Sequence, residues 1–442
     1  MTKLAQAGFY TLRSVKLKPL FPGAETPSQK NMSDYIDITK VVANWSFAES
    51  MDAPYISGRM TIQESDNLLE DLPIRGEESL QITYTDFYGD TITKDFIVYA
   101  VDNIGPENSI NDRMMKYTLD FTTRDKLNSD TREIRRSFAK QKISEMATTI
   151  FKEYYPDSSK EIEVEETDGE QTVVIPSLYP DAAMQFLSRR AYSQNNKTSL
   201  YKFFETGEKY YFCTHEYLID KYADFEGLDD DARNRLFFIY STLNDNTGSG
   251  QLRAQQSIND ITYGKKVDSF IDIKDGAYRR NVTELDIMNR TRIARTYDYS
   301  TEYKDYKAPQ DLKLTHSQDF VDSYMGFDGA PDTTLITDFT QIGQNRGELD
   351  KPYQHFYENY TTKPVVDYHM NLNSFTIDIQ GRSELYPGMV IKLDLYKFSN
   401  TLTGTREIDT QRSGKHIVLS INHSFSGDSY GQAVRVTKGG LS

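Results

Sequence analysis

The stretch SGKHIVLSINHSF, residues 413–425, holds two of the six histidines of the chain. Its larger side chains alternate with mostly small polar ones, and one parity contains Ile417, Leu419, Ile421, His423 and Phe425. This period of two is that of a half-buried strand, whose side chains point to opposite faces in turn. His416 and His423, seven residues apart, are therefore expected on opposite faces and cannot bind one metal ion together. The sequence predicts a structural strand in which His423 is packed and hydrogen-bonded.

The composition bounds the class of protein. At 442 residues the chain is long enough for two to four domains. Its net charge of −15 argues against a general nucleic-acid binder, although an acidic wall would let DNA slide past. The single cysteine excludes disulfides within the chain and is typical of folding in a reducing cytoplasm. No apolar run is long enough for a transmembrane helix or a signal peptide, so we expect no membrane insertion.

Short alternating segments separated by turns fill the first part of the chain. The segments predicted as strands are 35–42, 59–62, 80–84, 91–101 and 115–121. Gly89-Asp90, between two of them, is a hairpin signal. Regularly spaced strands of this kind predict a small barrel or sandwich, which we assign to residues 1–125.

A helical period replaces this pattern near residue 126. Apolar residues between Ile143 and Tyr154 recur at the spacing of one helix face, and Ser137 is the predicted N-cap. A second helix is expected to begin at Pro180, because proline suits the first turn. A hairpin formed by residues 200–204 and 210–214 should follow it. We assign residues 126–255 to an α+β middle domain.

Strand patterns return in the last part of the chain. The predicted strands are 269–273, 282–287, 291–299, 373–379, 390–395, 413–425 and 432–437. Residues 301–370 are rich in tyrosine, polar and poorly periodic, which predicts an insertion or an extended arm. The second all-β unit is therefore assigned to 256–300 and 371–442, on either side of this insertion.

The sequence lacks the motifs of common catalytic and cofactor sites. It has no phosphate-binding or dinucleotide-binding glycine loop, no HExxH zinc motif and no GxSxG nucleophile elbow. Cys213 and His215 could form a nucleophile–base pair on one face of a strand, but the aromatic residues beside them favour a buried thiol in a packed hairpin.

Acidic residues give no stronger indication of a site. Asp229-Asp230-Asp231 lacks the spacing of a calcium loop and is expected at a helix start. Glu64, Glu77 and Glu78 are expected to be solvated or to lie at a barrel rim. We therefore predict no catalytic, cofactor-binding or metal-binding residues, no cofactor and no enzyme activity.

Several segments, taken in order, resemble one known family. The segments are YIDITKVVANWSFAESMDAPYISGRMTIQES (35–65), LPIRGEESLQITYTD (72–86), PSLYPDAAMQFLSRRAYSQ with SLYKFFET (176–206), and LYPGMVIKLDL (385–395) with SGKHIVLSINHSF (413–425). They are similar to the first barrel, the middle domain and the second barrel of the central baseplate hub proteins of contractile-tailed (myovirus) bacteriophages. These hubs are related to the hub part of type VI secretion spike proteins. Residues 301–370 match no part of the family.

The resemblance implies a mixed, mainly β fold with two similar tube-like β-barrel domains and an α+β middle domain. It also implies a homotrimer, whose six barrels form a pseudo-six-fold ring with a lumen for DNA. Such a hub joins the six-fold tail tube, or tube-initiator proteins, to a trimeric spike, and the tape-measure protein is a further candidate partner. The expected location is the tail baseplate of a virion assembled in the host cytoplasm. The turns Arg75-Gly76 and Pro387-Gly388 should hold equivalent places in the two barrels.

Three other functions remain open at this stage. The chain could be another tube or baseplate adaptor, or the hub of a secretion or contractile injection system. A tail-associated cell-wall hydrolase would need a contiguous catalytic fold, and only residues 301–370 are unassigned. The last residues of the sequence carry no glycine-rich β-helix, so a separate spike protein is expected.

Overall fold

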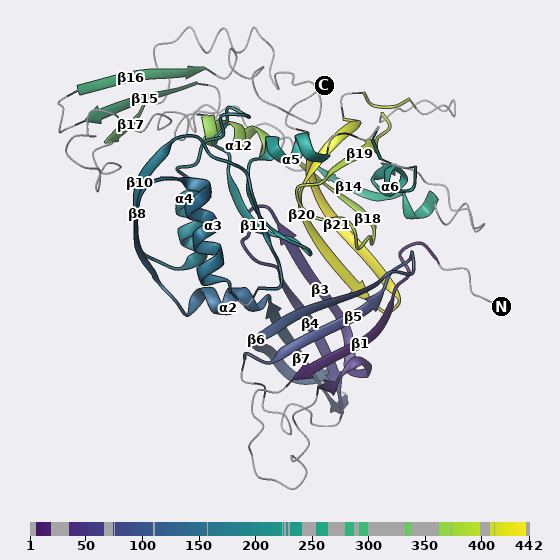
Figure 1. The fold of residues 1–442 in the computed structure, drawn as a ribbon. Helices are drawn as coiled ribbons and strands as arrows, with labels where there is room; N and C mark the ends of the chain where they lie inside the picture. The colour runs from purple at the N-terminus through teal and green to yellow at the C-terminus, as the bar shows by residue number, and fades with distance from the viewer. Residues whose placement is uncertain are drawn as a thin grey trace, which may run out of the picture.

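The computed structural model places strands, helices and loops for most of the chain (Figure 1). The residues described are 6–18, 35–65, 74, 76–108, 111–156, 158–222, 224, 227–228, 230–240, 253–263, 279–286, 291–298, 332–336, 362–372, 374–397, 407–410 and 412–438. The predicted strand 269–273 and most of the predicted arm 301–370 lie outside them.

One thirteen-stranded sheet contains strands from both the first and the last part of the chain. From the first part come β1 (Thr11–Lys18), β2 (Ile36–Asp37), β3 (Val42–Ser50), β4 (Ser57–Glu64), β5 (Ser79–Thr85), β6 (Thr91–Asn108) and β7 (Asn111–Thr122). From the last part come β13 (Phe237–Ile239), β14 (Ile258–Tyr263), β18 (Phe375–Gln380), β19 (Val390–Asp394), β20 (Gly414–Ser426) and β21 (Ser429–Thr437). The predicted strand 35–42 is instead the short β2 followed by a 3₁₀ turn, Thr39–Val41, before β3.

The order of strand pairing in the first part is repeated in the last part. Strands β3, β4, β7, β6 and β5 are neighbours in that order, and we call them the N-terminal unit. Strands β14, β18, β21, β20 and β19 are neighbours in the same order and form the C-terminal unit. Each strand of one unit therefore has a counterpart in the other.

Two β-bulges fall at matching positions in the two units. In the first strand of the N-terminal unit, β3, an extra residue follows Val42. In the first strand of the C-terminal unit, β14, an extra residue follows Ile258. The fourth strand of each unit has one at Tyr99, in β6, and at Leu419, in β20. A bulge places two residues of one strand opposite one of its partner, so it is a specific mark of register. Shared bulges in a shared strand order indicate an internal structural duplication.

The turns expected to correspond do so, one residue out of register. Glu77 donates its backbone N–H to Val98 at 2.6 Å, and Gly388 donates to Val418, the counterpart of Val98, at 2.8 Å. Both donors have a positive φ, 95° and 92°. Glu77 therefore holds the place of Gly388, and Gly76 that of Pro387. Arg75 lies outside the described residues.

The two units are joined within the sheet. The second half of β20, Ser420 to Ser426, pairs antiparallel with β3, running from Ser50 to Asn44. Aromatic rings stack across this junction: Trp45 lies on Phe425 with a centroid separation of 3.8 Å, and Phe47 lies on His423 at 4.0 Å. Figure 1 shows β3 and β20 at the centre of the sheet, with the strands of the two units on either side. The sheet is thus continuous from one unit to the other.

The middle of the chain packs its own core beside this sheet (Figure 1). Its elements are α2 (Arg124–Asp130), β8 (Ile134–Lys142), α3 (Ile143–Tyr154), β9 (Ile162–Val164), β10 (Glu170–Leu178), α4 (Pro180–Ser188), β11 (Lys202–Glu205), β12 (Tyr210–Cys213), α5 (His215–Tyr222) and α6 (Asp230–Arg235). The predicted helices and the hairpin are confirmed, and Pro180 is the first residue of α4. Ser137 is not an N-cap, because it lies within β8 and α3 begins only after Lys142.

Three strands from the later part of the chain form a sheet of their own. β15 (Arg279–Asp286) pairs with β16 (Thr291–Asp298) and with β17 (Asp332–Ile336) in a separate three-stranded sheet. The sequence assigned 256–300 to the second barrel, but the pairing partners of β15 are its own hairpin and a strand from within 301–370. Helix α12 (Thr362–Leu372) precedes β18 and packs Val366 and Met370 against α5 and β20.

Candidate functional site

The histidines of residues 413–425 lie on the same face of the sheet, which corrects the sequence prediction. Alternate residues of β21 point to one face of the sheet, and the residues paired with them in β20 point to the same face. The pairs are Tyr430 with Phe425, Gln432 with His423, Val434 with Ile421, and Val436 with Val418. The bulge at Leu419 adds one residue between Val418 and Ile421 and so reverses the alternation. His416, two residues before Val418, therefore faces the same side as His423. A simple period of two could not reveal this bulge.

His423 lies in a buried polar cluster at the junction of the units. It is 2% exposed, and its Nδ1 lies 2.7 Å from the Tyr430 hydroxyl. Gln432 donates to the backbone carbonyl of Arg382 at 2.7 Å beside it. Burial lowers the pKa of His423 well below its ordinary value, and the nearby Lys94 ammonium adds to this shift. The prediction of a packed, hydrogen-bonded histidine is confirmed.

His416 has a more apolar setting. It is fully buried, its Nδ1 lies 3.0 Å from the Gly414 carbonyl, and its ring stands edge-on to Phe375 at 5.3 Å. Burial lowers the pKa of His416 to about 3. The imidazole is therefore neutral at physiological pH, as in a structural histidine.

Cys213 and His215 do not form a catalytic pair. Cys213 ends β12, whereas His215 is the first residue of α5 rather than part of the same strand. The thiol is fully buried, and burial together with the nearby Glu165 carboxylate raises its pKa well above the ordinary value. A protonated, inaccessible thiol is a poor nucleophile, which agrees with the buried-thiol interpretation.

The acidic residues singled out in the sequence have structural roles. Glu64 and Glu78 are each 2% exposed and so are not solvated, whereas Glu77 is exposed. The alternative expectation, a place at a barrel rim, stays a prediction. The Glu78 carboxylate accepts the N–H of Gly76 at 3.0 Å and so braces the turn before β5. Asp230 begins α6, as expected for acidity at a helix start. No group of three or more potential metal ligands occurs among the described residues.

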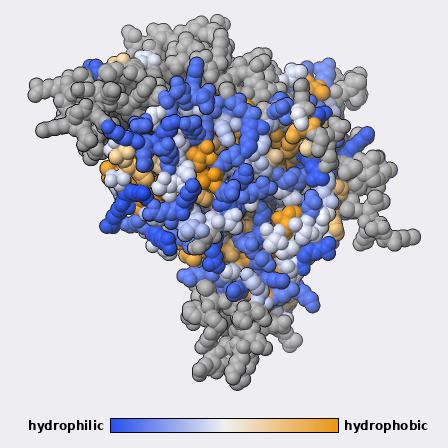
Figure 2. Space-filling view, viewed as in Figure 1, coloured by the Kyte–Doolittle hydropathy of each residue, from blue (hydrophilic) through white to orange (hydrophobic). Residues whose placement is uncertain are grey.

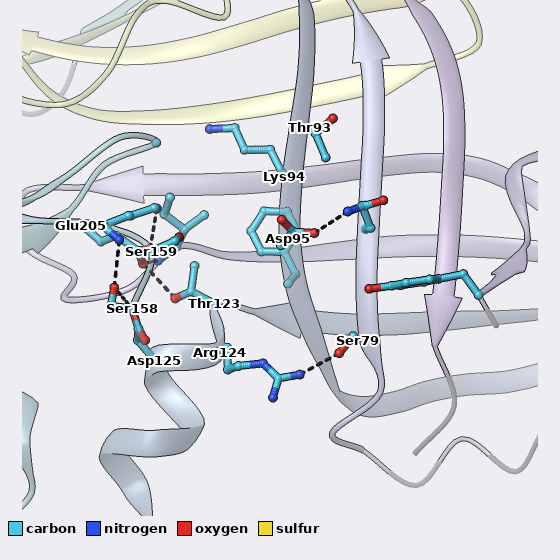
Figure 3. A pocket seen from close by; sticks show the side chains of 16 residues that line it. Ser79, Thr93, Lys94, Asp95, Thr123, Arg124, Asp125, Ser158, Ser159 and Glu205 are labelled. Carbon is cyan, nitrogen blue, oxygen red and sulfur yellow. Dashed lines mark hydrogen bonds and ion pairs between the residues drawn. The ribbon is translucent and has the colours of Figure 1, made fainter. Parts of the chain in front are cut away.

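A polar pocket of about 480 Å³ lies between the N-terminal unit and the middle of the chain (Figure 3). Its lining comes from β5 and β6, from the start of α2 and from the loops before β9 and after β11. Arg124 bonds Ser79 at 2.7 Å across the mouth, and Gln81 bonds Asp95 at 2.9 Å on the wall. These polar groups bond one another, as in a hydrated seam between packed elements.

Glu205 is the most buried charged group in this pocket. Its carboxylate is 1% exposed and accepts the Ile56 N–H at 2.9 Å and the Thr123 hydroxyl at 2.8 Å. The Lys160 ammonium lies 2.6 Å from it. Burial raises the pKa of Glu205 despite this neighbouring cation. Glu205 thus ties the hairpin β11–β12 to the start of β4 and the end of β7.

We expect Glu205→Ala to lower the free energy of unfolding by about 3 kcal/mol, because it leaves a buried N–H and a hydroxyl without their acceptor and takes the carboxylate away from Lys160, which keeps the Thr206 carbonyl. Urea unfolding followed by circular dichroism measures the change. Glu205→Gln is the matched control: it retains an acceptor oxygen, and Lys160 is 18% exposed and can be solvated. Equal losses in both variants would show that the charge, rather than the hydrogen bonds, matters.

Two of the large sheet's edges are without a partner strand among the described residues and flank its two units. One is β14, which pairs with β18 on one side, and the other is the second half of β6, which pairs with β7 on one side. The largest exposed fractions among the described large hydrophobic side chains, 54% each, belong to Tyr99 and Ile104 on this part of β6. The face of the molecule seen in Figure 2 is mostly hydrophilic, with small separate apolar patches.

No helix in the described parts of the chain combines the length and apolar character needed to cross a bilayer. No protein-family model matches the sequence. A search of curated proteins likewise gave no match.

Solved structures do show similarity. A tail protein from Neisseria meningitidis has a TM-score of 0.52 and 9% identity, over 97% of this chain and 96% of that one. A 43 kDa tail protein of prophage MuSo2 from Shewanella oneidensis has a TM-score of 0.48 and 10% identity, over 97% and 98%. A component of the Escherichia coli type VI secretion system, described as similar to two T4 tail proteins, has a TM-score of 0.41 and 8% identity, over 90% and 73%. The resemblance seen in the sequence is confirmed at the level of structural neighbours, and the fold is similar to that of the Neisseria tail protein.

Proposed function

We propose that this chain is the central hub of a contractile-tail baseplate, and that it acts as a structural protein rather than as an enzyme. In this proposal three chains form a ring that joins the six-fold tail tube to a three-fold spike. The observation that carries it is the internal duplication: two units with the same strand order and the same two bulges. Three copies of a twofold-repeated chain present six similar units, which is what a junction between six-fold and three-fold symmetry requires.

Each unit would act as one tube-like barrel of the ring. The N-terminal barrel would fall within residues 1–125 and the C-terminal barrel within 256–300 and 371–442, with the middle domain, 126–255, placed outside them. The separate sheet β15–β17 would belong to an arm that includes 301–370. The net charge of −15 suits a lumen through which DNA slides without binding. In this role the chain would reside in the virion tail and bind tube and spike proteins.

A hub of a secretion or contractile injection system is the second candidate. The same duplication supports it, and the two candidates differ in cargo and partners rather than in fold. A cell-wall hydrolase has less support, because Cys213, His215, His416 and His423 are all buried. Purified protein that clears a peptidoglycan suspension would favour the hydrolase over either hub.

The mass and symmetry of the purified chain test the proposal. We expect a trimer by multi-angle light scattering, about three times the chain mass of 50.9 kDa, and a ring with a pseudo-six-fold outline and an open centre by electron microscopy. A candidate spike protein from the same tail should bind on the three-fold axis. Exposed Val174 on β10 offers a control, since it lies on the separate β8–β10 sheet rather than on β6 or β14, and Val174→Asp should leave the trimer intact. A chain that stays monomeric at every concentration and with every tail partner would overturn the hub proposal.

A further inference from the structure

We propose that neighbouring copies of the chain join by strand pairing, with the second half of β6 in one copy lying antiparallel to β14 of the next. This inference rests on the proposed trimer and specifies its contact. It is drawn from the duplication. The unpaired part of β6 corresponds to the part of β20 that pairs with β3, and β14 corresponds to β3. The junction inside the chain is therefore a template for a junction between chains.

Side chains on β6 are more exposed than their counterparts on β20, as expected if β6 lacks a partner strand that β20 has. Leu419, at the bulge of β20, is 6% exposed and belongs to a buried cluster that includes Met51, Leu218 of α5 and Met370 of α12. Tyr99, at the corresponding bulge of β6, is 54% exposed. Ile104 further along the same edge is equally exposed. Large apolar side chains exposed on a strand edge are typical of a surface that another strand covers.

The complementary edge shows the same difference. Trp45 and Phe47 of β3 are each 1% exposed, covered by the rings of β20. Their counterparts in β14, Ile261 and Tyr263, are only half-buried. A second copy of β6 would cover Ile261 and Tyr263 as β20 covers the aromatic pair of β3.

The template fixes the register of the proposed pairing. Ser424 faces Ser46 across the internal junction. When the strand pairs of the two units are matched residue by residue, Ser424 takes the same position as Gly105, and Ser46 takes the same position as Thr262. Gly105 of one copy should therefore lie opposite Thr262 of the next.

Features of the β6 edge restrict what can pair with it. β6 has a second bulge, between Asp102 and Gly105, that β20 lacks. Pro106 follows it and has no N–H to donate. Bulges and prolines on an edge discourage indiscriminate pairing, so they select a strand that arrives in one register.

The proposed contact is head-to-tail. Each chain offers one β6 edge and one β14 edge, and these are different surfaces. Such a heterologous interface forms a ring when the rotation closes and a filament when it does not. Six strand junctions, three within chains and three between them, would then run around the proposed ring.

Engineered cysteines test the register. The chain contains one cysteine, which is buried, so the background is low. A Cβ added at Gly105 meets no atom within 4 Å, and Thr262 is exposed. Six strands separate β6 from β14 within a chain, so a disulfide between these positions joins two copies. The double variant Gly105→Cys/Thr262→Cys should give covalent dimers and trimers on mild oxidation, and nothing larger than a trimer.

A register control uses the same edge. In Gly105→Cys/Asp260→Cys the second cysteine lies two residues along β14, a diagonal separation of about 7–8 Å that exceeds the reach of a disulfide. We expect at least tenfold less cross-linking from it. Ile104→Lys should in addition weaken the trimer while leaving the circular dichroism spectrum of the monomer unchanged.

The outcomes separate the two proposals. A wild-type trimer by light scattering without a cross-link between Gly105 and Thr262, or with equal cross-linking of the control, would overturn the strand pairing and leave the hub proposal standing. A wild-type monomer would overturn both. Cross-linked species larger than a trimer would show that the contact forms an open filament and would overturn the ring.

Discussion

Acidifying the protein from pH 7.5 to pH 5 should remove about 4 kcal/mol of stability through the buried His215 and His416, and the buried His423 should add to this loss. In the folded state burial lowers the pKa of His215 to about 4 and of His416 to about 3, and that of His423 falls well below its ordinary value. The unfolded histidines titrate near 6.5. Below that pH the histidines bind protons in the unfolded chain but not in the folded chain. Their contribution to stability is therefore present above pH 6.5 and is lost as the pH falls. At pH 5 the loss is about 2 kcal/mol each for His215 and His416.

Buried carboxyl groups act in the opposite direction. The pKa values of Glu49 and Glu205 are raised by burial, so their protonation stabilises the folded state as the pH falls. A difference between variants separates the two effects. The gap in unfolding free energy between the wild type and His416→Gln should shrink by about 2 kcal/mol between pH 7.5 and pH 5, as measured by urea unfolding at each pH.

A matched control adds a histidine instead of removing one. Asn422 lies on the same strand, β20, with an exposed side chain. Asn422→His should therefore leave the pH dependence of stability unchanged, because its pKa is the same in the folded and unfolded chain. A gap for His416→Gln that stays constant with pH would show that His416 has the same pKa in the folded and the unfolded chain.

Local patterns in the sequence predicted most of the regular elements. The strands β5, β18 and β21 and the helices α3 and α4 follow from period and turn signals, because their inward faces are continuous and apolar. β1 was missed, although its burial alternates toward its end, because its polar residues weaken the pattern. The strand pattern of β15 and β16 did not reveal that they form a separate sheet with β17, since a strand pattern does not specify which strand it pairs with.

The sites depended more strongly on contacts between distant parts of the chain. The bulge at Leu419 leaves no mark in the local sequence, yet it decides which face His416 occupies. Glu205 reaches Ile56 and Thr123, which are 149 and 82 residues away in the sequence. No spacing rule relates such residues, so the pocket between the sheet and the middle of the chain could not be predicted.

The duplication was implied only by the resemblance. Corresponding positions hold unlike residues: Trp45 matches Ile261, and Asp120 matches Arg435. Each unit needs only an apolar inner face and a bulge at the same place, and many sequences satisfy that requirement. The duplication is therefore visible in the strand order and register of the backbone, but not in the identity of the side chains.

Phe425→Ala should lower the free energy of unfolding by about 4 kcal/mol, within the range measured when a buried phenylalanine is truncated. Phe425 is fully buried where the two units meet. Its ring is stacked between Trp45, at 3.8 Å, and Tyr430, at 4.1 Å, and the edge of Tyr10 contacts it at 5.0 Å. Removing it opens a cavity among large, rigid rings that cannot readily close the gap.

The chain provides its own probe for this junction. Trp45 is the single tryptophan and is 1% exposed, so its fluorescence reports on the contact between β3 and β20. Urea unfolding should show an earlier midpoint for Phe425→Ala by both fluorescence and circular dichroism. Phe87→Ala, in the turn between β5 and β6 where the side chain is half-buried, is the matched control and should cost about 1 kcal/mol. If fluorescence changed at low urea while circular dichroism did not, the two units would unfold separately, and the continuous sheet would not make them one cooperative body.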